Sequence, residues 1–205
     1  METDLKDYYE VEGSNIVSNA VVYDLASSIR ASKFPMATNL EKPKAEITKR
    51  TVSLGSSKKG EGHDQFLTSI RVNFDLKFSN KAWVELERYR FIEFCSSQST
   101  MHRITKFDIK SQCNEYVTDE IIDLLNQYVK EYNDNPSPEA YLKVLYNIPS
   151  GFQLTARLTT NYRALKTVVS QRSNHRLPDW RELCEWIHTL PYFDILTGGV
   201  SNEEK

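Results

Sequence analysis

Residues 151–178 carry the clearest chemical signature of this sequence. Five cations stand in this segment without a single Asp or Glu: Arg157, Arg163, Lys166, Arg172 and Arg176. Apolar residues recur there at helical spacing, and Arg172 takes the next position on the stripe that Leu165 and Val169 mark. Because a buried, unpaired charge is costly, Arg172 must meet an anion. That anion is either a carboxylate from elsewhere in the fold or a phosphate of a ligand.

Two further stretches combine polar and basic side chains within a short length. In the first, residues 98–114, Gln98, His102, Arg103 and Ser111 follow a predicted helix. Its cations either contact a ligand or only complement the dipole at a helix end. In the second, His63 lies beside Gly62, and glycine suits either the close approach of a ligand or an ordinary turn.

Cysteine and metal chemistry are disfavoured by spacing. The three cysteines (Cys95, Cys113 and Cys184) are widely separated and form no CxxC pair, so neither a disulfide framework nor a zinc site is indicated. No histidine is placed as a base for Cys113, which argues against a nucleophilic cysteine. The four histidines lack the spacing of metal ligands, and we expect no metal.

The elements that must position these residues follow from periodicity and capping signals. We expect a single domain over 1–205, with an N-terminal helix over 14–33, a mobile loop over 35–62 and a flexible tail over 198–205. Strands are predicted over 70–78 and 152–160, where apolar and polar residues alternate. Helices are predicted over 81–96, 118–132 and 161–172, from Pro138, and from Pro178. This order of elements predicts an α+β fold.

Composition limits the classes of partner. The 205 residues hold 26 Lys and Arg against 28 Asp and Glu, a net charge of −2, so we expect no general nucleic-acid binding. No apolar run approaches the ~20 residues that span a bilayer, so no membrane is expected either. The first residues lack the features of a signal peptide, and we expect a cytoplasmic location. Charge is balanced over the chain but not within 151–178, which favours small phosphorylated ligands.

The first two stretches together resemble the flavin-dependent thymidylate synthases, in a divergent form. Within residues 98–114 the family's Gln, His, second Arg and late Ser stand as Gln98, His102, Arg103 and Ser111. The family's Asn-x-Arg-x-Leu reads Asn161-Tyr-Arg163-Ala-Leu165, followed by Arg172 nine positions after Arg163 and then by a Trp- and Glu-containing segment at 180–182. Gly62-His63 looks like the family's Gly-His pair. The resemblance spans about 60–190.

The resemblance implies a fold, cofactors and roles. It implies an antiparallel or mixed sheet with long flanking helices, a flavin- and nucleotide-binding core over 63–190, and a homotetramer with interface active sites. It implies FAD as cofactor, with NADPH and methylenetetrahydrofolate as co-substrates, for the reductive methylation of dUMP or a related pyrimidine deoxynucleotide. The implied FAD contacts are His63, His102, Arg103, Asn161 and Arg163. The implied dUMP contacts are Gln98, Ser111 and Arg172, and Ser111 and Arg172 are the catalytic candidates.

Three positions depart from the family pattern and keep alternatives open. Met101 replaces the first Arg of the signature, Ile109 replaces a Glu, and Cys113 replaces the last Arg. The alternative is a family member with altered or lost catalysis that binds a nucleotide or a partner protein. A third hypothesis, a nucleic-acid modifier using the arginines of 151–178, predicts binding that weakens steeply with salt.

Overall fold

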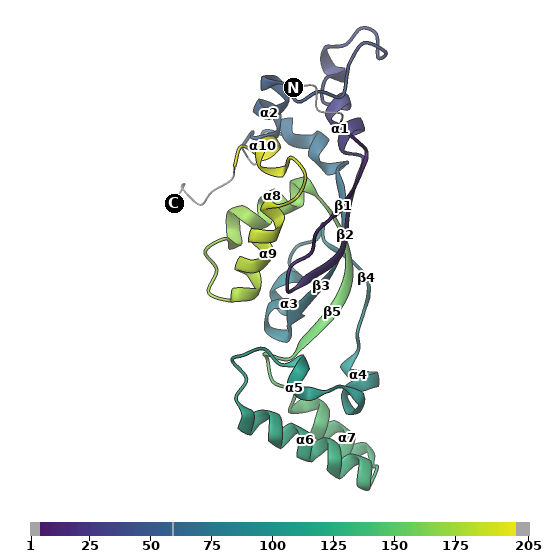
Figure 1. Cartoon of the computed structure of the whole chain (residues 1–205), viewed down its shortest axis with the longest axis vertical. Coiled ribbons are helices and arrows are strands. Elements are labelled where there is room, and N and C mark those ends of the chain that lie inside the picture. Colours follow the sequence, from purple (N-terminus) through teal and green to yellow (C-terminus); the bar gives the residue numbers. More distant parts are fainter. Residues whose placement is uncertain (1–4, 59, 200–205) are drawn as a thin grey trace. The chain divides into compact units, whose positions relative to one another are not determined.

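The computed structural model describes residues 5–58 and 60–199 (Figure 1). Their Cα positions form two compact units. Unit 1 comprises Met1–Leu76, Tyr89–Cys95 and Arg157–Lys205, and unit 2 comprises Lys77–Arg88 and Ser96–Ala156. The strands are β1 Tyr8–Val11, β2 Val17–Tyr23, β3 Arg71–Ser79, β4 Glu93–Ser97 and β5 Gln153–Asn161.

The helices alternate with these strands along the chain. The α-helices are α1 Leu25–Ala31, α2 Lys49–Gly55, α3 Asn80–Leu86, α4 Thr100–Arg103, α5 Ile109–Gln112, α6 Asp119–Asp134, α7 Pro138–Tyr146, α8 Tyr162–Arg172, α9 Pro178–His188 and α10 Phe193–Thr197. Three short 3₁₀-helices complete the described elements: η1 Phe34–Met36, η2 His63–Thr68 and η3 Ile104–Lys106.

The strands form one five-stranded sheet in the order β1-β2-β3-β5-β4. Both β1 with β2 and β2 with β3 pair antiparallel. At one end of the β3–β5 pair, Tyr162 N donates to Ile70 O over 3.1 Å, and at the other Asn80 N donates to Phe152 O over 2.9 Å. The two bonds fit one continuous antiparallel pairing of β3 with β5. The predicted α+β class is therefore confirmed, with an antiparallel sheet.

The helix predicted over 14–33 is wrong for its first half, which forms β2. Val17, Ala20 and Val22 are the buried residues of this strand. The three-residue step from Val17 to Ala20, which indicated a helix, arises from an irregularity in the β2–β3 register between Ser18 and Val21. Asn19 has φ 50° there, and an extra residue of this kind interrupts the alternation of a strand. Only Leu25–Ala31 is helical.

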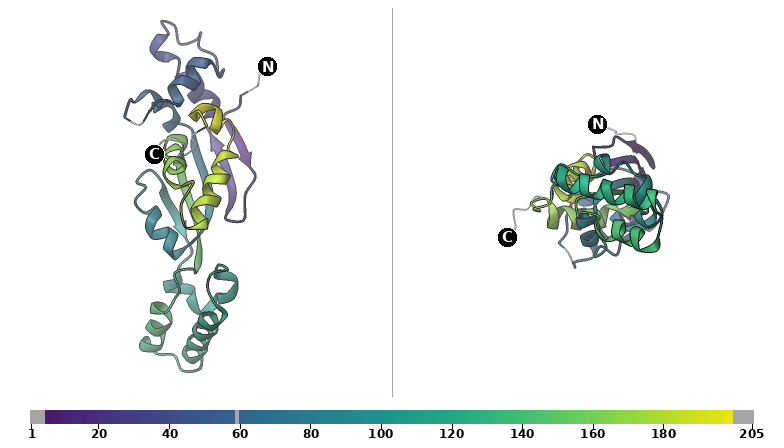
Figure 2. Two further views of the ribbon diagram at one scale, coloured as in Figure 1. Left: turned by 90° about the vertical axis from the view of Figure 1, so that its left-hand side faces the viewer. Right: turned by 90° about the horizontal axis from the view of Figure 1, so that it is seen from below.

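In unit 1, helices α8 and α9 pack against the sheet (Figures 1 and 2). The apolar stripe of α8, which includes Leu165 and Val169, is fully buried. From α9, Trp186 lies on Phe74 of β3 with ring centroids 5.0 Å apart. The predicted strand over 70–78 and the predicted helix over 161–172 are confirmed.

Unit 2 contains a helical pair, α6 and α7, around its own apolar core. Ser137 caps α7 by accepting a hydrogen bond from Ala140 N over 3.1 Å, and Pro138 occupies its first turn. The core consists of Ile104, Ile109, Ile122, Leu125, Val144 and Phe152. The helices predicted over 118–132 and from Pro138 are confirmed.

Other predicted segments differ in part. The helix predicted over 81–96 ends at Leu86, and the chain then forms β4, whose residues are all exposed at the edge of the sheet. The predicted loop over 35–62 contains α2, which a capping box between Thr48 and Thr51 begins. Its mobility and the single domain stay predictions. Of the predicted tail, residues 200–205 lie outside the described residues.

Candidate functional site

A cavity of about 740 Å³ lies in unit 1, where the first turns of α8 meet the chain between α2 and η2. Its size is within the range of pockets for small ligands and cofactors. Residues from α8, from the segment after α2 and from η2 form most of the lining: Ser56, Ser57, Lys58, Gly60, Asp64, Thr68, Phe91, Asn161, Arg163, Ala164, Lys166, Thr167 and Ser170. Two of the predicted FAD contacts, Asn161 and Arg163, therefore border one cavity.

Helix α8 is fixed at its start by its cap and by its buried stripe. The Asn161 side chain caps the helix, accepting a hydrogen bond from Ala164 N over 3.0 Å. Tyr162 is fully buried, and its hydroxyl donates to Pro191 O over 2.7 Å. With Leu165 anchored in the core, Arg163 and Lys166 are directed to the cavity side of the helix. The N-terminus of a helix also favours anions through its dipole.

A buried carboxylate, Asp64, organises the basic side chains of this cavity. Its residue is 4% exposed, and Oδ1 accepts a hydrogen bond from Arg163 Nε over 2.8 Å. The other oxygen, Oδ2, is 3.2 Å from Lys166 Nζ. The trio carries one formal positive charge. The terminal nitrogens of Arg163 have no hydrogen-bond partner among the described residues, so they are available to an anionic ligand.

Lys166 also fixes the segment that follows α2. Its Nζ donates to Gly55 O over 2.8 Å and to Ser57 O over 2.7 Å. Cations commonly bind the last carbonyl groups of a helix in this way. The Ser57 Oγ atom is buried without a hydrogen-bond partner among the described residues. The cavity therefore combines fixed walls with polar atoms that a bound group can satisfy.

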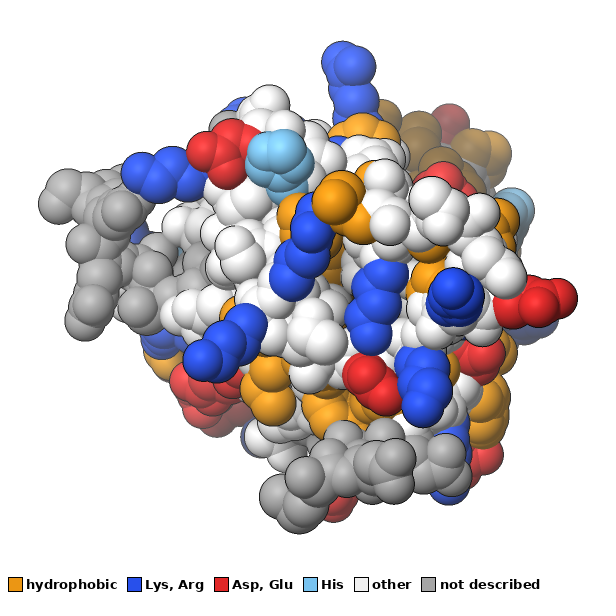
Figure 3. All heavy atoms as spheres, turned by 90° about the horizontal axis from the view of Figure 1, so that it is seen from above, with side chains coloured by type: hydrophobic (Ala, Val, Ile, Leu, Met, Phe, Trp, Pro, Cys, Tyr) orange, Lys and Arg blue, Asp and Glu red, His pale blue; other side chains and the backbone are white. Residues whose placement is uncertain are grey.

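The part of unit 1 that precedes this cavity in sequence is rich in cations. Figure 3 shows Lys and Arg side chains gathered on the end of unit 1 that lies at the top of Figure 1. Residues 30–58 contain Arg30, Lys33, Lys42, Lys44, Lys49, Arg50 and Lys58, against only Glu41 and Glu46. A local excess of one charge attracts ligands of the other and raises their rate of association.

Arg172 lies against two aromatic rings. It is half-buried, and its guanidinium lies over the Trp180 ring, 4.7 Å from the centroid. It also lies 5.7 Å from the centroid of Tyr89, and its Nε donates to the Tyr89 hydroxyl over 2.9 Å. Sequence reasoning weighed a carboxylate or a phosphate as partner, and it missed this aromatic pair. Arg172 is outside the described lining of the cavity, and its contact with dUMP stays a prediction.

The other predicted site residue of unit 1 is His63, at the first position of η2. Its side chain is exposed, and the preceding Gly62 has φ 76°, a conformation that favours glycine. His63 is next to Asp64 in sequence but is outside the described lining of the cavity. Its predicted contact with FAD remains untested.

The four remaining predicted residues belong to unit 2. Gln98 extends the pairing of β4, because its N donates to Thr155 O and its Oε1 accepts from Thr155 N, each over 2.9 Å. His102 and Arg103 are exposed on α4. In α5, Ser111 is exposed, and its Oγ donates to Asp108 O over 3.0 Å. Their roles also stay predictions.

The three residues that depart from the family pattern, Met101, Ile109 and Cys113, lie in unit 2. Ile109 is 1% exposed and belongs to the apolar core, surroundings that suit an apolar side chain and not a carboxylate. Met101 is exposed, and its carbonyl accepts a hydrogen bond from the Tyr141 hydroxyl over 2.7 Å. Burial raises the pKa of the Cys113 thiol, which keeps it protonated and a poor nucleophile.

Sequence reasoning missed Asp64 as the centre of this site. The signal was present, since Asp64 directly follows the Gly62-His63 pair, and Arg163 and Lys166 are three residues apart on one helix face. The sequence alone does not show that the segment around Asp64 lies close to the start of α8.

In the described residues no group of three or more His, Cys, Asp or Glu is placed to hold a metal ion, and no helix is long and apolar enough to cross a membrane.

Comparison with known proteins gives matches at the level of structure. No protein-family model and no curated protein matches this sequence. The flavin-dependent thymidylate synthase ThyX from Helicobacter pylori, in a structure complexed with FAD and dUMP, matches with a TM-score of 0.66 at 15% identity, over 88% of this chain and 97% of that one. The UMP/dUMP methylase PolB from Streptomyces cacaoi, bound with 5-Br dUMP, matches with a TM-score of 0.62 at 16% identity, over 93% and 97%.

The chain thus has the fold of flavin-dependent thymidylate synthases along nearly its whole length. A second Helicobacter pylori structure of that synthase, with FAD and dUMP, gives the same TM-score of 0.66 over 89% of this chain. The TM-scores of 0.62 to 0.66 establish the fold, whereas identities of 15% to 16% do not show the reaction.

Proposed function

We propose that this chain is an FAD-dependent enzyme of the thymidylate synthase type. The proposed reaction is the reductive methylation of dUMP, or a related pyrimidine deoxynucleotide, with methylenetetrahydrofolate as carbon donor and NADPH as reductant. The observation that carries this proposal is the cavity at the start of α8, where Asn161 and Arg163 border a preformed space beside a helix N-terminus. The fold shared with a synthase complexed with FAD and dUMP supports it.

The residues of the cavity suit an anionic cofactor. Arg163 presents terminal nitrogens without a described partner, which match the oxygens of a pyrophosphate. The Ser57 hydroxyl is buried and unpartnered, so a ligand oxygen can satisfy it. Asp64 holds Arg163 and Lys166 in place before the ligand arrives, which lowers the cost of ordering them on binding. FAD, when bound, supplies the hydride chemistry that amino-acid side chains lack.

The remaining parts of the proposal rest on the resemblance. His63, His102 and Arg103 are proposed as further FAD contacts, and Gln98, Ser111 and Arg172 as contacts to the nucleotide. A homotetramer with active sites at subunit interfaces is proposed on the same ground. A cytoplasmic location accords with the use of NADPH and a folate.

A turnover assay tests the reaction directly. Purified protein is incubated with FAD, NADPH, methylenetetrahydrofolate and dUMP, and dTMP is measured by chromatography. Product that depends on all four compounds supports the proposal, with Arg163→Ala as the variant expected to lose it. The control variant is Asp123→Asn, an exposed residue of α6 in unit 2. No product under these conditions, with FAD bound, contradicts the catalytic part.

A second candidate function is a nucleotide-binding member of the fold without this catalysis. The observation that favours it is the burial of Ile109 in the core of unit 2, where the family has a Glu. Met101 and Cys113 add two further losses of charge at the signature. Tight, saturable binding of dUMP without formation of dTMP supports this candidate over the first.

A further inference from the structure

The cavity at the start of α8 contains an aromatic ring to which the proposed reaction gives no role, that of Phe91. Phe91 is 72% exposed and lines the cavity. Its backbone is fixed, because the buried Thr160 donates from Oγ1 to Phe91 O over 2.8 Å, and the next residue, Ile92, is itself buried in the core. An exposed aromatic ring beside a cavity is a surface on which a planar base can stack.

The same lining presents hydrogen-bond donors that no described residue satisfies. Asn161 is 8% exposed, and its Oδ1 caps α8, so its Nδ2 group keeps two hydrogens for an acceptor in the cavity. The terminal nitrogens of Arg163 and the ammonium group of Lys58 also lack a partner among the described residues. The Ser57 hydroxyl is a further unpartnered group, with its oxygen buried. Together these donors match the oxygens of a diphosphate.

The charge and polarity of this lining also favour phosphates. Its described charged residues are three cations and one carboxylate: Lys58, Arg163, Lys166 and Asp64. The lining therefore carries a net positive charge, which attracts an anion. Besides Phe91, Ala164 supplies the one apolar side chain of the described lining. Such a lining suits a single base and its phosphates better than the three fused rings of a flavin.

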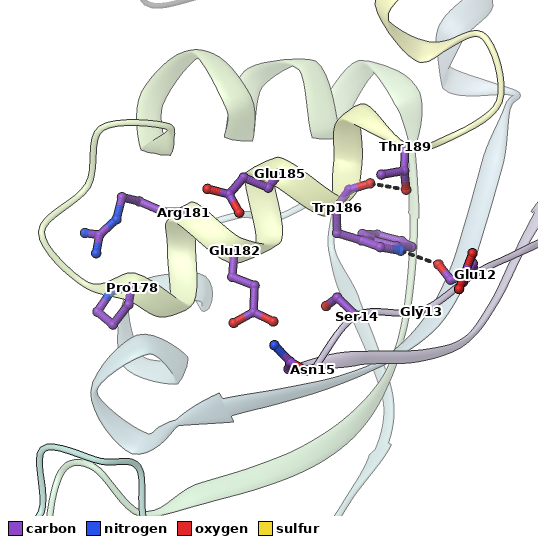
Figure 4. A pocket seen from close by; sticks show the side chains of 10 residues that line it. All are labelled: Glu12, Gly13, Ser14, Asn15, Pro178, Arg181, Glu182, Glu185, Trp186 and Thr189. Carbon is purple, nitrogen blue, oxygen red and sulfur yellow. Dashed lines mark hydrogen bonds between the residues drawn. The ribbon is translucent and has the colours of Figure 1, made fainter.

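A second cavity of unit 1 has the opposite charge (Figure 4). It measures about 580 Å³ and lies between the β1–β2 turn and α9. Its described charged residues are three acids and one cation: Glu12, Glu182, Glu185 and Arg181. Phosphate groups are therefore expected in the cavity at the start of α8 and not in this one.

We propose that the cavity at the start of α8 binds the adenosine diphosphate half of FAD, with the adenine stacked on Phe91 and the diphosphate at Arg163 and Lys58. This inference rests on the proposed function, because it takes FAD as the cofactor. It adds a means of regulation, since free ADP carries the same groups and competes with FAD for the cavity. Phe91 belongs to none of the motifs in which this chain resembles the family.

Displacement of FAD from the full chain, followed by flavin fluorescence, tests the proposal. ADP and inorganic pyrophosphate should each displace FAD, with ADP effective at the lower concentration. Phe91→Ala should weaken FAD and ADP about tenfold, the effect of losing one stacked base, and leave pyrophosphate binding unchanged. Phe91→Tyr keeps a ring and should bind FAD as the unmodified chain does. The matched control is Phe94→Ala, which removes an exposed ring of β4 outside the described lining.

Three results overturn the proposal, each in variants whose melting temperature shows that they are folded. The first is FAD that stays bound at saturating ADP. The second is equal ADP affinity in Phe91→Ala and Phe94→Ala. The third is an equal loss of ADP and pyrophosphate affinity in Phe91→Ala, because pyrophosphate has no base to stack. Failure of the proposed function differs from these: the chain takes up no FAD, while calorimetry still detects ADP binding that Phe91→Ala weakens, which supports the nucleotide site.

Discussion

Arg163 and Asp64 are joined by a hydrogen bond of 2.8 Å between Nε and Oδ1, although 99 positions separate them in the chain. This bond connects the start of α8 to η2 inside a cavity of unit 1. Asp64 is buried and anchors the pair, whereas the Arg163 side chain is 34% exposed and is accessible to a ligand.

Replacing Asp64 with Asn separates the structural role of this pair from its role in binding. The change leaves Arg163 and Lys166 without their buried counter-ion, and the free energy of unfolding should fall by about 2 kcal/mol. This figure is below that of fully buried pairs, because Arg163 is partly exposed. Urea denaturation measures the loss, with Asp123→Asn as control. An unchanged midpoint would show that the ion pairs contribute nothing to stability.

Arg172 should serve both packing and ligand binding. Its guanidinium lies over Trp180, so Arg172→Ala should lower the free energy of unfolding by about 1 kcal/mol through the lost cation–π contact. If Arg172 also contacts a nucleotide phosphate, the affinity for dUMP should fall at least about tenfold. Thermal denaturation and dUMP titration separate the two effects. A large loss of melting temperature with unchanged dUMP affinity would limit Arg172 to packing.

Much of this fold could be predicted from local patterns, and its exceptions have identifiable causes. The alternation through Val72 and Phe74 predicted β3 because one face of that strand is buried. In β2, the register irregularity after Ser18 imitated helical spacing, and only pairing with β3 distinguishes the two. After Leu86, the chain becomes the edge strand β4, a choice that depends on β5 as partner.

In the candidate site, too, local sequence patterns indicated some residues, whereas contacts between distant segments were missed. The resemblance to the family motif pointed to Asn161 and Arg163, which lie within a few residues of one helix start. Asp64 was missed as their partner, because its pairing with Arg163 joins segments that are distant in sequence. The aromatic partners of Arg172 come from two separate segments, at Tyr89 and Trp180, and no local pattern indicates them.

Gly55 should tolerate no side chain, even though it lies in a helix. An added Cβ would be 2.0 Å from Leu196 O, so Gly55→Ala forces α2 away from α10. Overpacking of this kind costs about 1 to 3 kcal/mol. Because Lys166 donates to Gly55 O, the same change should disturb the cavity. Thermal denaturation measures the cost, and Ser53→Ala on the exposed side of α2 is the control. Equal stability of the two variants would contradict the close contact.

The three cysteines should react with a thiol reagent in order of their environments. Cys95 is exposed, burial raises the pKa of Cys113, and burial raises the pKa of Cys184 to about 11. A raised pKa keeps a thiol protonated, and the thiolate is the reactive form, so Cys95 should react first and Cys184 last at pH 8. Raising the pH should accelerate Cys184 only as it approaches 11. A native Cys184 that reacts as fast as Cys95 would show that it is not buried.

The most direct test of the account is a titration of the purified chain with FAD, followed by visible absorption and flavin fluorescence. The account predicts saturable binding with a shifted flavin spectrum, and affinity reduced at least about tenfold in Arg163→Ala, whereas Asp123→Asn binds normally. Protein that is folded, carries no flavin and takes up none at saturating FAD would contradict the account. Equal affinity in Arg163→Ala would move the flavin away from the cavity at the start of α8.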